Sequence, residues 1–366
     1  MYIAHATISD LSSAIAHVMP AVPPKSTLFV LEHIRLSADG DRIELTGTDT
    51  EVVITSHLPA HIASPGAVLV PARKLHDIIR ALPDDLSCEL SCADNKLVLK
   101  TSIGRYELPT LNAAEFPDLP QTEHATSVVL AENDVHAIAD YVTYAASTEQ
   151  YRPAMTGVKF EIGSELIAVA TDGYRLATIS VPLGASPSNT AEAIVPARIV
   201  ALLAKTMGDV TLGLSRTHAI IASDTVRIVA RLIDEQYPQW RNVLPSSSDK
   251  QATIARQDLL RAIKRVALFT SSASNLVRFR WNNSGVVLSV TDLDTGAGAE
   301  ETLPCELIGD PIEIGFNYTY IADALAHMPG ERVTFAMTSP SRAVLITPAD
   351  ETGYAITKLV MPMRIG

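Results

Sequence analysis

The first candidate for a catalytic residue in this chain is Asp294, in the segment LDTGA at 293–297. A D-T-G-A sequence is a short signature of aspartic proteases, and a dimer could bring two such carboxylates together to share a proton. The same segment follows a strand-like run, where a turn is needed in any case. An aspartic-protease-like dimeric hydrolase is therefore an alternative, and peptide hydrolysis before and after Asp294→Asn tests it.

Neither phosphate binding nor metal binding is supported by a complete motif. The segment TGAGAE at 295–300 lacks the G-K-[ST] that a P-loop requires, so its glycines are expected in a turn. Cys88 and Cys92 are separated by three residues and Cys305 stands far from both, which is no disulfide framework. A structural zinc site would need a second pair at ligand spacing. The sequence therefore predicts no catalytic residue, no metal and no cofactor.

The composition is that of a globular protein. The 366 residues are 47% hydrophobic and carry a formal net charge of −12, with a pI near 5.3. No stretch approaches the roughly 18 consecutive apolar residues of a membrane helix, and the N-terminus shows no signal-peptide pattern, so we expect a cytoplasmic location. The acidic balance argues against a generally basic DNA-binding surface, for which a pI above about 9 is usual.

Sequence features that recur three times predict the elements that position these residues. Candidate helix starts recur at steps of 124 residues, at Asp10, Asp134 and Asp258. Strand-like runs end in Thr-Asp at steps of 123 and 120 residues, at Thr48, Thr171 and Thr291. The segment VPAR at 70–73 returns 125 residues later. Three tandem repeats therefore account for the whole chain, with boundaries in polar stretches that give domains of 1–123, 124–247 and 248–366.

Each repeat is predicted to hold two helices among alternating strands. Leu75, Ile78, Ile79 and Leu82 recur at helical spacing. Runs of alternating character, such as 41–47, 285–292 and 331–339, indicate strands with one buried face. Because no long βαβ crossover is present, we expect an α+β fold with antiparallel sheets.

Several predicted helices have a basic outer face. On the helix from Arg256, the apolar residues share one side, while Arg261, Lys264 and Arg265 fall on the other. The second helices of repeats one and two place cations in similar positions, at Arg73, Arg80, Arg198 and Lys205. Such faces can contact the phosphate backbone of DNA without reading its sequence, and a merely solvated face is the alternative.

Over its whole length the chain resembles the family of bacterial DNA polymerase III beta subunits, the DNA sliding clamps. The most specific motifs are TGTD at 46–49, VPARK at 70–74, ATDGYRLA at 170–177, YPQWRNVLP at 237–245 and VMPMR at 360–364. The resemblance implies a DNA clamp fold of three tandem, structurally similar domains and a head-to-tail homodimer that closes into a ring around duplex DNA. It implies a processivity factor in DNA replication, not an enzyme, whose partners are duplex DNA, the replicative DNA polymerase, the clamp loader and other proteins with clamp-binding motifs.

The resemblance also implies three sets of site residues. A partner-peptide-binding pocket between repeats two and three would be formed by Met155, Thr171, Gly173, Tyr174, Arg175, Leu176, Pro238, Val243, Leu359, Val360, Met361, Pro362, Met363 and Arg364. DNA contacts would come from Lys25, Arg73, Arg80, Gln150, Arg152, Arg198 and Lys205. The dimer interface would use exposed apolar groups and complementary charges, at Lys74, Arg105, Tyr106, Leu108, Leu268, Phe269, Glu300 and Glu301.

Two alternatives concern the pocket. A C-terminal strand could simply complete a core, without binding anything. A protein-interaction adaptor that never encircles DNA would share every feature of the pocket. A ring should stay on circular DNA and slide off a linear one, so retention separates the clamp from the adaptor.

Overall fold

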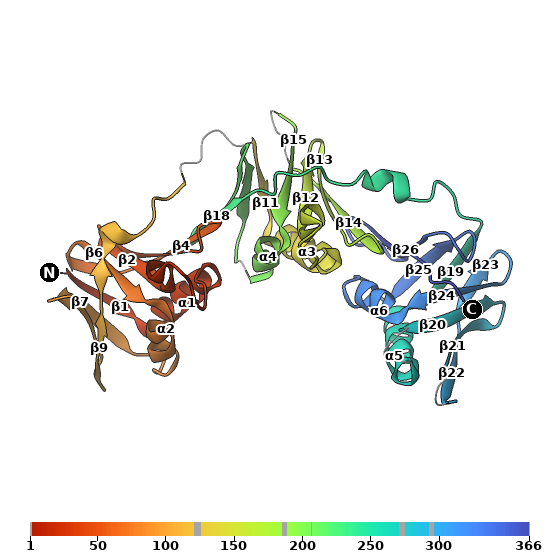
Figure 1. Ribbon diagram of the computed structural model, residues 1–366, viewed down its shortest axis with the longest axis horizontal. Coiled ribbons are helices and arrows are strands. Elements are labelled where there is room, and N and C mark those ends of the chain that lie inside the picture. Colours follow the sequence, from red (N-terminus) through yellow and green to blue (C-terminus); the bar gives the residue numbers. More distant parts are fainter. Residues whose placement is uncertain are drawn as a thin grey trace. The chain divides into compact units, whose positions relative to one another are not determined.

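The computed structural model describes residues 2–120, 126–184, 189–205, 207–270, 275–292 and 296–365 (Figure 1). The chain forms two compact units, Met1–Leu130 with Met207–Arg231, and Ala131–Thr206 with Leu232–Gly366. Each unit is described by itself below. In the described ranges, no helix has the length and apolarity needed to span a membrane.

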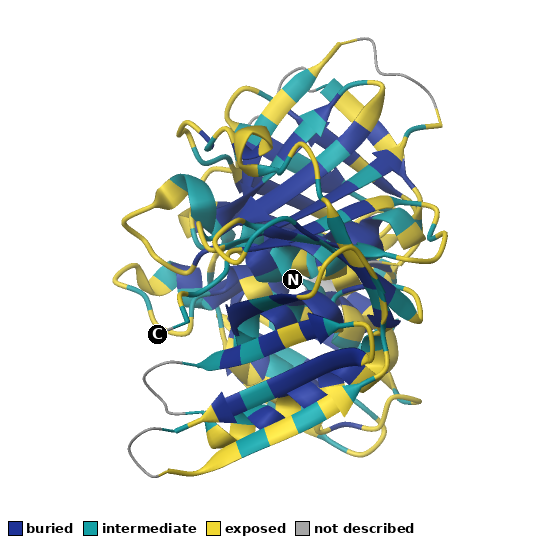
Figure 2. Cartoon of the chain, turned by 90° about the vertical axis from the view of Figure 1, so that its right-hand side faces the viewer, coloured by how far each residue is buried: buried dark blue, intermediate teal, exposed yellow. Residues whose placement is uncertain are grey.

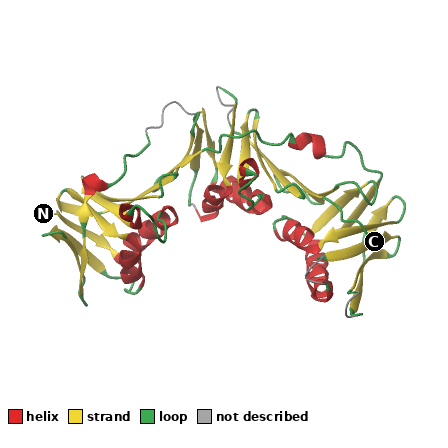
Figure 3. Ribbon diagram, in the orientation of Figure 1, coloured by secondary structure: helices red, strands yellow, loops and turns green. Residues whose placement is uncertain are grey.

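The helices, red in Figure 3, begin at the predicted spacing along the chain. Helices α1 (Ile8–Val18), α3 (Glu132–Val142) and α5 (Arg256–Val266) each have 11 residues. Their starts lie 124 residues apart, and the predicted Asp10, Asp134 and Asp258 stand in the first turn, where the helix dipole favours a carboxylate. The second helices are α2 (Ala72–Arg80), α4 (Ala197–Val200, continued by a 3₁₀ turn Ala201–Lys205) and α6 (Tyr318–Ala326).

The first unit contains two antiparallel sheets. One has five strands in the order β5 (His61–Ser64), β1 (Tyr2–Thr7), β7 (Ser87–Ala93), β8 (Lys96–Lys100) and β9 (Arg105–Pro109). The other has nine strands in the order β10 (Leu111–Asn112), β6 (Gly66–Pro71), β2 (His33–Asp39), β3 (Arg42–Thr48), β4 (Val52–Pro59), β18 (Val226–Arg231), β17 (His218–Ala222), β16 (Val210–Leu214) and β11 (Thr126–Leu130).

The second unit also contains two antiparallel sheets, which completes the α+β fold that the sequence predicts. Its nine strands run in the order β15 (Ala191–Pro196), β12 (Gly157–Ile162), β13 (Glu165–Thr171), β14 (Arg175–Pro182), β27 (Ala355–Val360), β26 (Val344–Pro348), β25 (Arg332–Met337), β19 (Lys250–Ala255) and β23 (Glu306–Ile308). Its four strands run in the order β22 (Gly298–Leu303), β21 (Gly285–Thr291), β20 (Leu276–Asn282) and β24 (Ile312–Asn317).

Each nine-stranded sheet joins strands of two consecutive repeats. Five strands of repeat one meet four of repeat two at the pair β4·β18, and four strands of repeat two meet five of repeat three at β14·β27. The two compact units therefore cut through repeat two and do not follow the repeat boundaries. The predicted domain boundaries stay a prediction, and the first of them falls at 123, outside the described residues.

The core follows the predicted periodicity. Helix α5 buries Leu259, Ile263 and Val266, while Arg261, Lys264 and Arg265 are exposed on its other side, as expected. On α2, Leu75 and Ile79 are buried and Ile78 is half-buried. Figure 2 shows buried and exposed residues alternating along the strands, because successive side chains point to opposite faces of a sheet.

Candidate functional site

The Thr-Asp marker is a strand-end turn that the chain builds twice in the same way. After β13, Thr171 Oγ1 donates to the carbonyl of Arg175 at 2.7 Å, and Asp172 Oδ1 accepts from the backbone N–H groups of Tyr174 and Arg175, both at 2.9 Å. After β3, Thr48 and Asp49 make the matching bonds around Val52. The marker recurs because these short polar side chains close a tight turn.

Gly173 lets this turn pass close to a neighbouring cation. Its φ of +92° lies in the region that only glycine adopts freely, and a Cβ built there would stand 3.2 Å from a guanidinium nitrogen of Arg152. Arg152, a predicted DNA contact, therefore lies beside the turn that the family resemblance implies for peptide binding. The turn presents Tyr174 outward, with 56% of the residue exposed.

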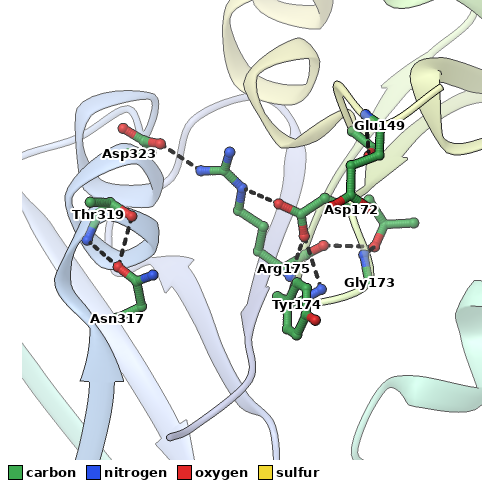
Figure 4. A network of polar contacts seen from close by, with 10 residues as sticks. Glu149, Asp172, Gly173, Tyr174, Arg175, Asn317, Thr319 and Asp323 are labelled. Atoms are coloured by element: carbon green, nitrogen blue, oxygen red, sulfur yellow. Dashed lines mark hydrogen bonds and ion pairs between the residues drawn. The ribbon is translucent and has the colours of Figure 1, made fainter. Parts of the chain in front are cut away.

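Arg175 points inward and ties repeat two to repeat three (Figure 4). Its Nε is 3.0 Å from Asp172 Oδ2, and its Nη1 is 2.5 Å from Asp323 Oδ2 on α6. The guanidinium also lies over the rings of Tyr144 at 5.3 Å and Tyr320 at 4.9 Å. Two carboxylates and two aromatic faces around a mostly buried cation fix its position.

Tyr320 and Asp323 were not predicted as site residues. The ring of Tyr320 stacks on Tyr174 at 6.2 Å between centroids, and the Arg175 guanidinium lies over the Tyr320 ring of this pair. Both missed residues belong to α6, where the third repeat lacks the VPAR segment of the other two. The chain therefore offered no repeated marker that would have identified them.

The C-terminal segment crosses this region. Leu359 pairs with Leu176 and Val360 with Arg175 along β27 and β14. Beyond the strand, Met361 donates its N–H to the carbonyl of Tyr174 at 2.9 Å, and Met363 donates to Gly315 of β24 at 2.8 Å. The segment thus lies between the Tyr174 turn and the third repeat.

The apolar and aromatic residues of the predicted pocket fall into two groups. Leu176, Leu359 and Val360 are buried core residues, so they form a floor and not open walls. Tyr174, Val243 and Met361 are exposed, Met361 by 39%, and the remaining apolar members are half-buried, namely Met155, Pro238, Pro362 and Met363. A cavity of about 470 Å³ elsewhere in this unit, at the β12–β13 end, is lined by Glu161, Glu165 and Glu192 among others and contains none of the predicted residues.

The segment 237–245 is fastened to β12 and β13 by its aromatic and basic residues. Tyr237 donates its hydroxyl to the carbonyl of Val169 at 3.2 Å, Trp240 Nε1 donates to Glu161 at 3.1 Å, and Arg241 Nη2 lies 2.6 Å from the same carboxylate. Burial alone would raise the pKa of Glu161, but hydrogen bonds from Arg241, Trp240 and Lys159 outweigh it and lower the pKa to about 2. This segment therefore carries Pro238 and Val243 on a fixed support.

The predicted DNA contacts are all exposed cations or amides. Lys25, Arg73 and Arg80 belong to the first unit, and Gln150, Arg152, Arg198 and Lys205 to the second. Their exposure fits a role in phosphate contact, and the role itself stays a prediction.

Among the predicted interface residues, Leu108 does not have the exposed side chain that the sequence led us to expect; the interface role of the whole set stays a prediction. Strand β9 is an edge strand, as expected, but Leu108 is only 4% exposed. Strand alternation puts Tyr106 and Leu108 on the face that covers the repeat's own core, so Leu108 offers no free apolar group. Leu268 is 81% exposed after α5, Phe269 is also exposed, and Lys74 is exposed on α2. Glu301 pairs with Arg265 of its own chain at 2.7 Å, and Glu300 lies 3.7 Å from Arg280.

Nothing in the described ranges groups three possible metal-ligating side chains. Asp294, the candidate protease residue, lies outside the described residues.

Three domain families match consecutive parts of the chain. Residues 6–120 match the N-terminal domain, 129–239 the central domain and 241–364 the C-terminal domain of the DNA polymerase III beta subunit. The beta sliding clamp of Pseudomonas aeruginosa is 30% identical over 95% of this chain and 96% of its own length. The beta sliding clamp of Caulobacter vibrioides is 29% identical over 97% of this chain and 98% of its own length. The solved P. aeruginosa clamp bound to griselimycin superposes with a TM-score of 0.94 at 29% identity and covers 100% of both chains.

Proposed function

This chain belongs to the family of DNA polymerase III beta subunits, the bacterial beta sliding clamps, and from that premise we propose that two copies close head to tail into a ring around duplex DNA. In this family the chain is the processivity subunit of the polymerase and not an enzyme. The aspartic-protease alternative is therefore abandoned. We place the ring in the cytoplasm, where bacterial DNA is replicated.

The observation that carries the ring is the count of strands in the four sheets. Both nine-stranded sheets join five strands of one repeat to four of another, and the sheets left over are the five-stranded sheet of repeat one and the four-stranded sheet of repeat three. A second copy supplies the missing half of each. The contact is heterologous, and two of them close a ring if the rotation closes.

The two existing junctions indicate which strands would meet. At the first junction Ala230 faces Val52, and at the second Val360 faces Arg175. Val52, Arg175 and Ala297 are equivalent, because each accepts the backbone bond from the Asp of its Thr-Asp turn. Ala230 and Leu108 occupy equivalent positions. Following the cross-strand partners from the first strand of each repeat leads from Thr126 to Ala230 and from Tyr2 to Leu108, and the two starting residues are 124 residues apart.

Applied to the ring, this register pairs β9 of one copy with β22 of the other. Leu108 faces Ala297, Tyr106 faces Ala299, and Arg105 faces Glu300. The opposite charges of the last pair support the assignment, because cross-strand neighbours of opposite charge stabilise a sheet. Buried Leu108 would then contribute through its backbone.

DNA would be held by topology together with weak phosphate contacts. The exposed cations on α2, on α4 and in the loops at Lys25 and Arg152 are suited to a uniform backbone, since contacts to phosphate carry no sequence information. A net charge of −12 fits such a protein, because retention does not depend on overall attraction.

We place partner peptides on the surface formed by Tyr174, Val243, Met361 and Met363, above the floor of Leu176 and Leu359. Flexible methionine side chains repack around different apolar residues, which suits a shared docking site for the polymerase, the clamp loader and other partners.

Paired cysteines test the ring and its register. Tyr106→Cys with Ala299→Cys should give a disulfide-linked dimer on oxidation, whereas the off-register combination Tyr106→Cys with Leu303→Cys should not. The linked dimer should remain on DNA when that DNA is a nicked circle and slide off after linearisation. Equal linking by both combinations would refute the register, and equal retention on circle and line would favour the non-encircling adaptor.

Labelled griselimycin serves as the probe, since the P. aeruginosa clamp has been solved bound to it, and we propose that in this chain it occupies the peptide surface. Met361→Asp should weaken binding at least tenfold, because a carboxylate replaces an apolar contact. The matched control is Met207→Asp, at an exposed methionine of the first unit. Equal affinity of both variants would place the binding surface elsewhere.

A further inference from the structure

A lysine lies entirely inside the junction between repeats two and three. Lys358 of β27 is 0% exposed, and its strand neighbours across the sheet are the buried Ala177 and Ile346. Its Nζ donates a hydrogen bond to the carbonyl of Tyr141, in the last turn of α3. It also lies over the rings of Tyr144 at 4.8 Å and Tyr141 at 5.8 Å.

These surroundings attract an ammonium group but do not pair it with a negatively charged side chain. The last carbonyls of a helix lack intrahelical partners and carry its partial negative charge, and aromatic faces attract cations. Within the described part of the chain, no carboxylate comes within ion-pair distance of Lys358. Burying a charge without such a partner is costly.

The charged and titratable groups around Lys358 come from four elements. Helix α3 contributes Tyr141 and the exposed Asp140, whose Oδ1 lies 2.7 Å from His327 Nδ1 at the end of α6. The ring of His327 stacks on Tyr144 at 4.7 Å, and Arg175 of β14 lies over Tyr144 as well, with Asp323 of α6 as its partner. Burial, opposed by the attraction of Asp140, lowers the pKa of Lys358 to about 7.

The other junction has no counterpart of this cation. Because Val360 and Ala230 are equivalent, Lys358 corresponds to Ile228, a buried residue opposite Ile54 and Ile221. The helix spacing of 124 residues puts His17 at the place of Tyr141 and Pro20 at that of Tyr144. The register of the sheet therefore does not require a lysine there.

We propose that Lys358 is a proton-binding switch that makes the junction of repeats two and three sensitive to pH. In the unfolded chain a lysine keeps its proton up to about pH 10.4. In the folded junction the proton is lost above about pH 7. The folded state therefore binds fewer protons between these values, and the junction gains stability as pH rises from about 7 towards 10. Strand β27 leads directly to Met361, so the switch lies beneath the proposed peptide surface without depending on it.

A pair of methionine variants tests the switch. Lys358→Met replaces the cation by an apolar side chain of similar length, and Lys264→Met removes an exposed lysine of α5 as the control. Thermal unfolding midpoints are measured from pH 6 to pH 10. The unfolding midpoint of Lys358→Met should lie furthest above that of the wild type at pH 6, and this difference should shrink above pH 7. The difference between the Lys264→Met control and the wild type should not change with pH. An excess of the Lys358→Met midpoint that does not change with pH would overturn the proposal.

A direct titration covers the case in which Lys358→Met does not fold. In the wild-type chain with ¹³C-labelled lysine, one Cε resonance should titrate with a midpoint near pH 7 and the others above pH 10. Lys358→Arg, which cannot lose its proton in this range, should lack that resonance. If every lysine titrates above pH 10, Lys358 is no switch.

Discussion

The two junctions β4·β18 and β14·β27 have the same strand register but different side-chain chemistry. The first is apolar at its centre, with Ile54 opposite Ile228. Its helix α1 packs on β4 through buried apolar residues, and within the described residues it makes one side-chain hydrogen bond to that strand, between His17 Nδ1 and Ser56 Oγ at 3.3 Å. The second contains Arg175, Lys358 and stacked tyrosines. Backbone pairing therefore sets how repeats join, while the side chains at the joint are free to take on other tasks.

Placing a lysine in the apolar junction should have the largest effect. Ile228→Lys buries an ammonium group at the position equivalent to Lys358. Pro20 occupies the position equivalent to Tyr144, so no aromatic ring from that position faces the cation, and an uncompensated buried charge costs about 3 to 5 kcal/mol. The urea midpoint should fall accordingly, while Ile228→Met should lose less than about 1.5 kcal/mol. If both variants lose the same unfolding free energy, the two junctions tolerate a buried cation equally and do not differ in this respect.

Removing the central cation of the polar junction should have the next largest effect. Arg175→Ala leaves the half-buried Asp172 without its cationic partner and should cost about 3 kcal/mol in unfolding free energy. Arg175→Lys should recover only part of this, because an ammonium cannot reproduce the planar contacts with Tyr144 and Tyr320. Full recovery in the lysine variant would mean that charge alone holds the junction.

The attachment of the segment 237–245 to β12, which precedes repeat three, should be sensitive to acid. The pKa of Glu161 is lowered to about 2, so its stabilisation is complete above its ordinary value near 4.5 and is lost as pH falls towards 2. Glu161→Gln should lose about 2 kcal/mol at neutral pH and unfold with a weaker dependence on pH below 4.5. An unchanged acid profile would exclude the carboxylate as the fastening group.

The smallest effect concerns a hydrogen bond between repeats two and three, beside the β14·β27 junction. Tyr354 donates its hydroxyl to Asp134 Oδ1 of α3 at 2.8 Å. Tyr354→Phe should cost about 1 kcal/mol, the usual contribution of one hydrogen bond. Hydrogen exchange at the N-terminal turn of α3 should rise in this variant and remain unchanged in α1.

The sequence could predict the features that recur in each of the three repeats. The helix starts, the strands that end in Thr-Asp and the basic side of α5 all follow from local spacing and periodicity. The sharing of sheets between repeats was not predicted, because β14 and β27 carry no mark of their pairing. Arg175 and Asp323 are 148 residues apart, and only the fold brings them together. The exposure expected of the Leu108 side chain was wrong, because the edge position of β9 does not decide which face of the strand points inward.

The open edges of β9 and β22 have a practical consequence for handling the protein. In the described chain neither strand has a neighbour on its outer side. An unpaired strand edge is a template for any other strand. In the proposed ring these edges are covered, and mass action would expose them whenever the concentration falls. Dilute solutions, not concentrated ones, should therefore be where this protein is most easily lost to aggregation and to surfaces.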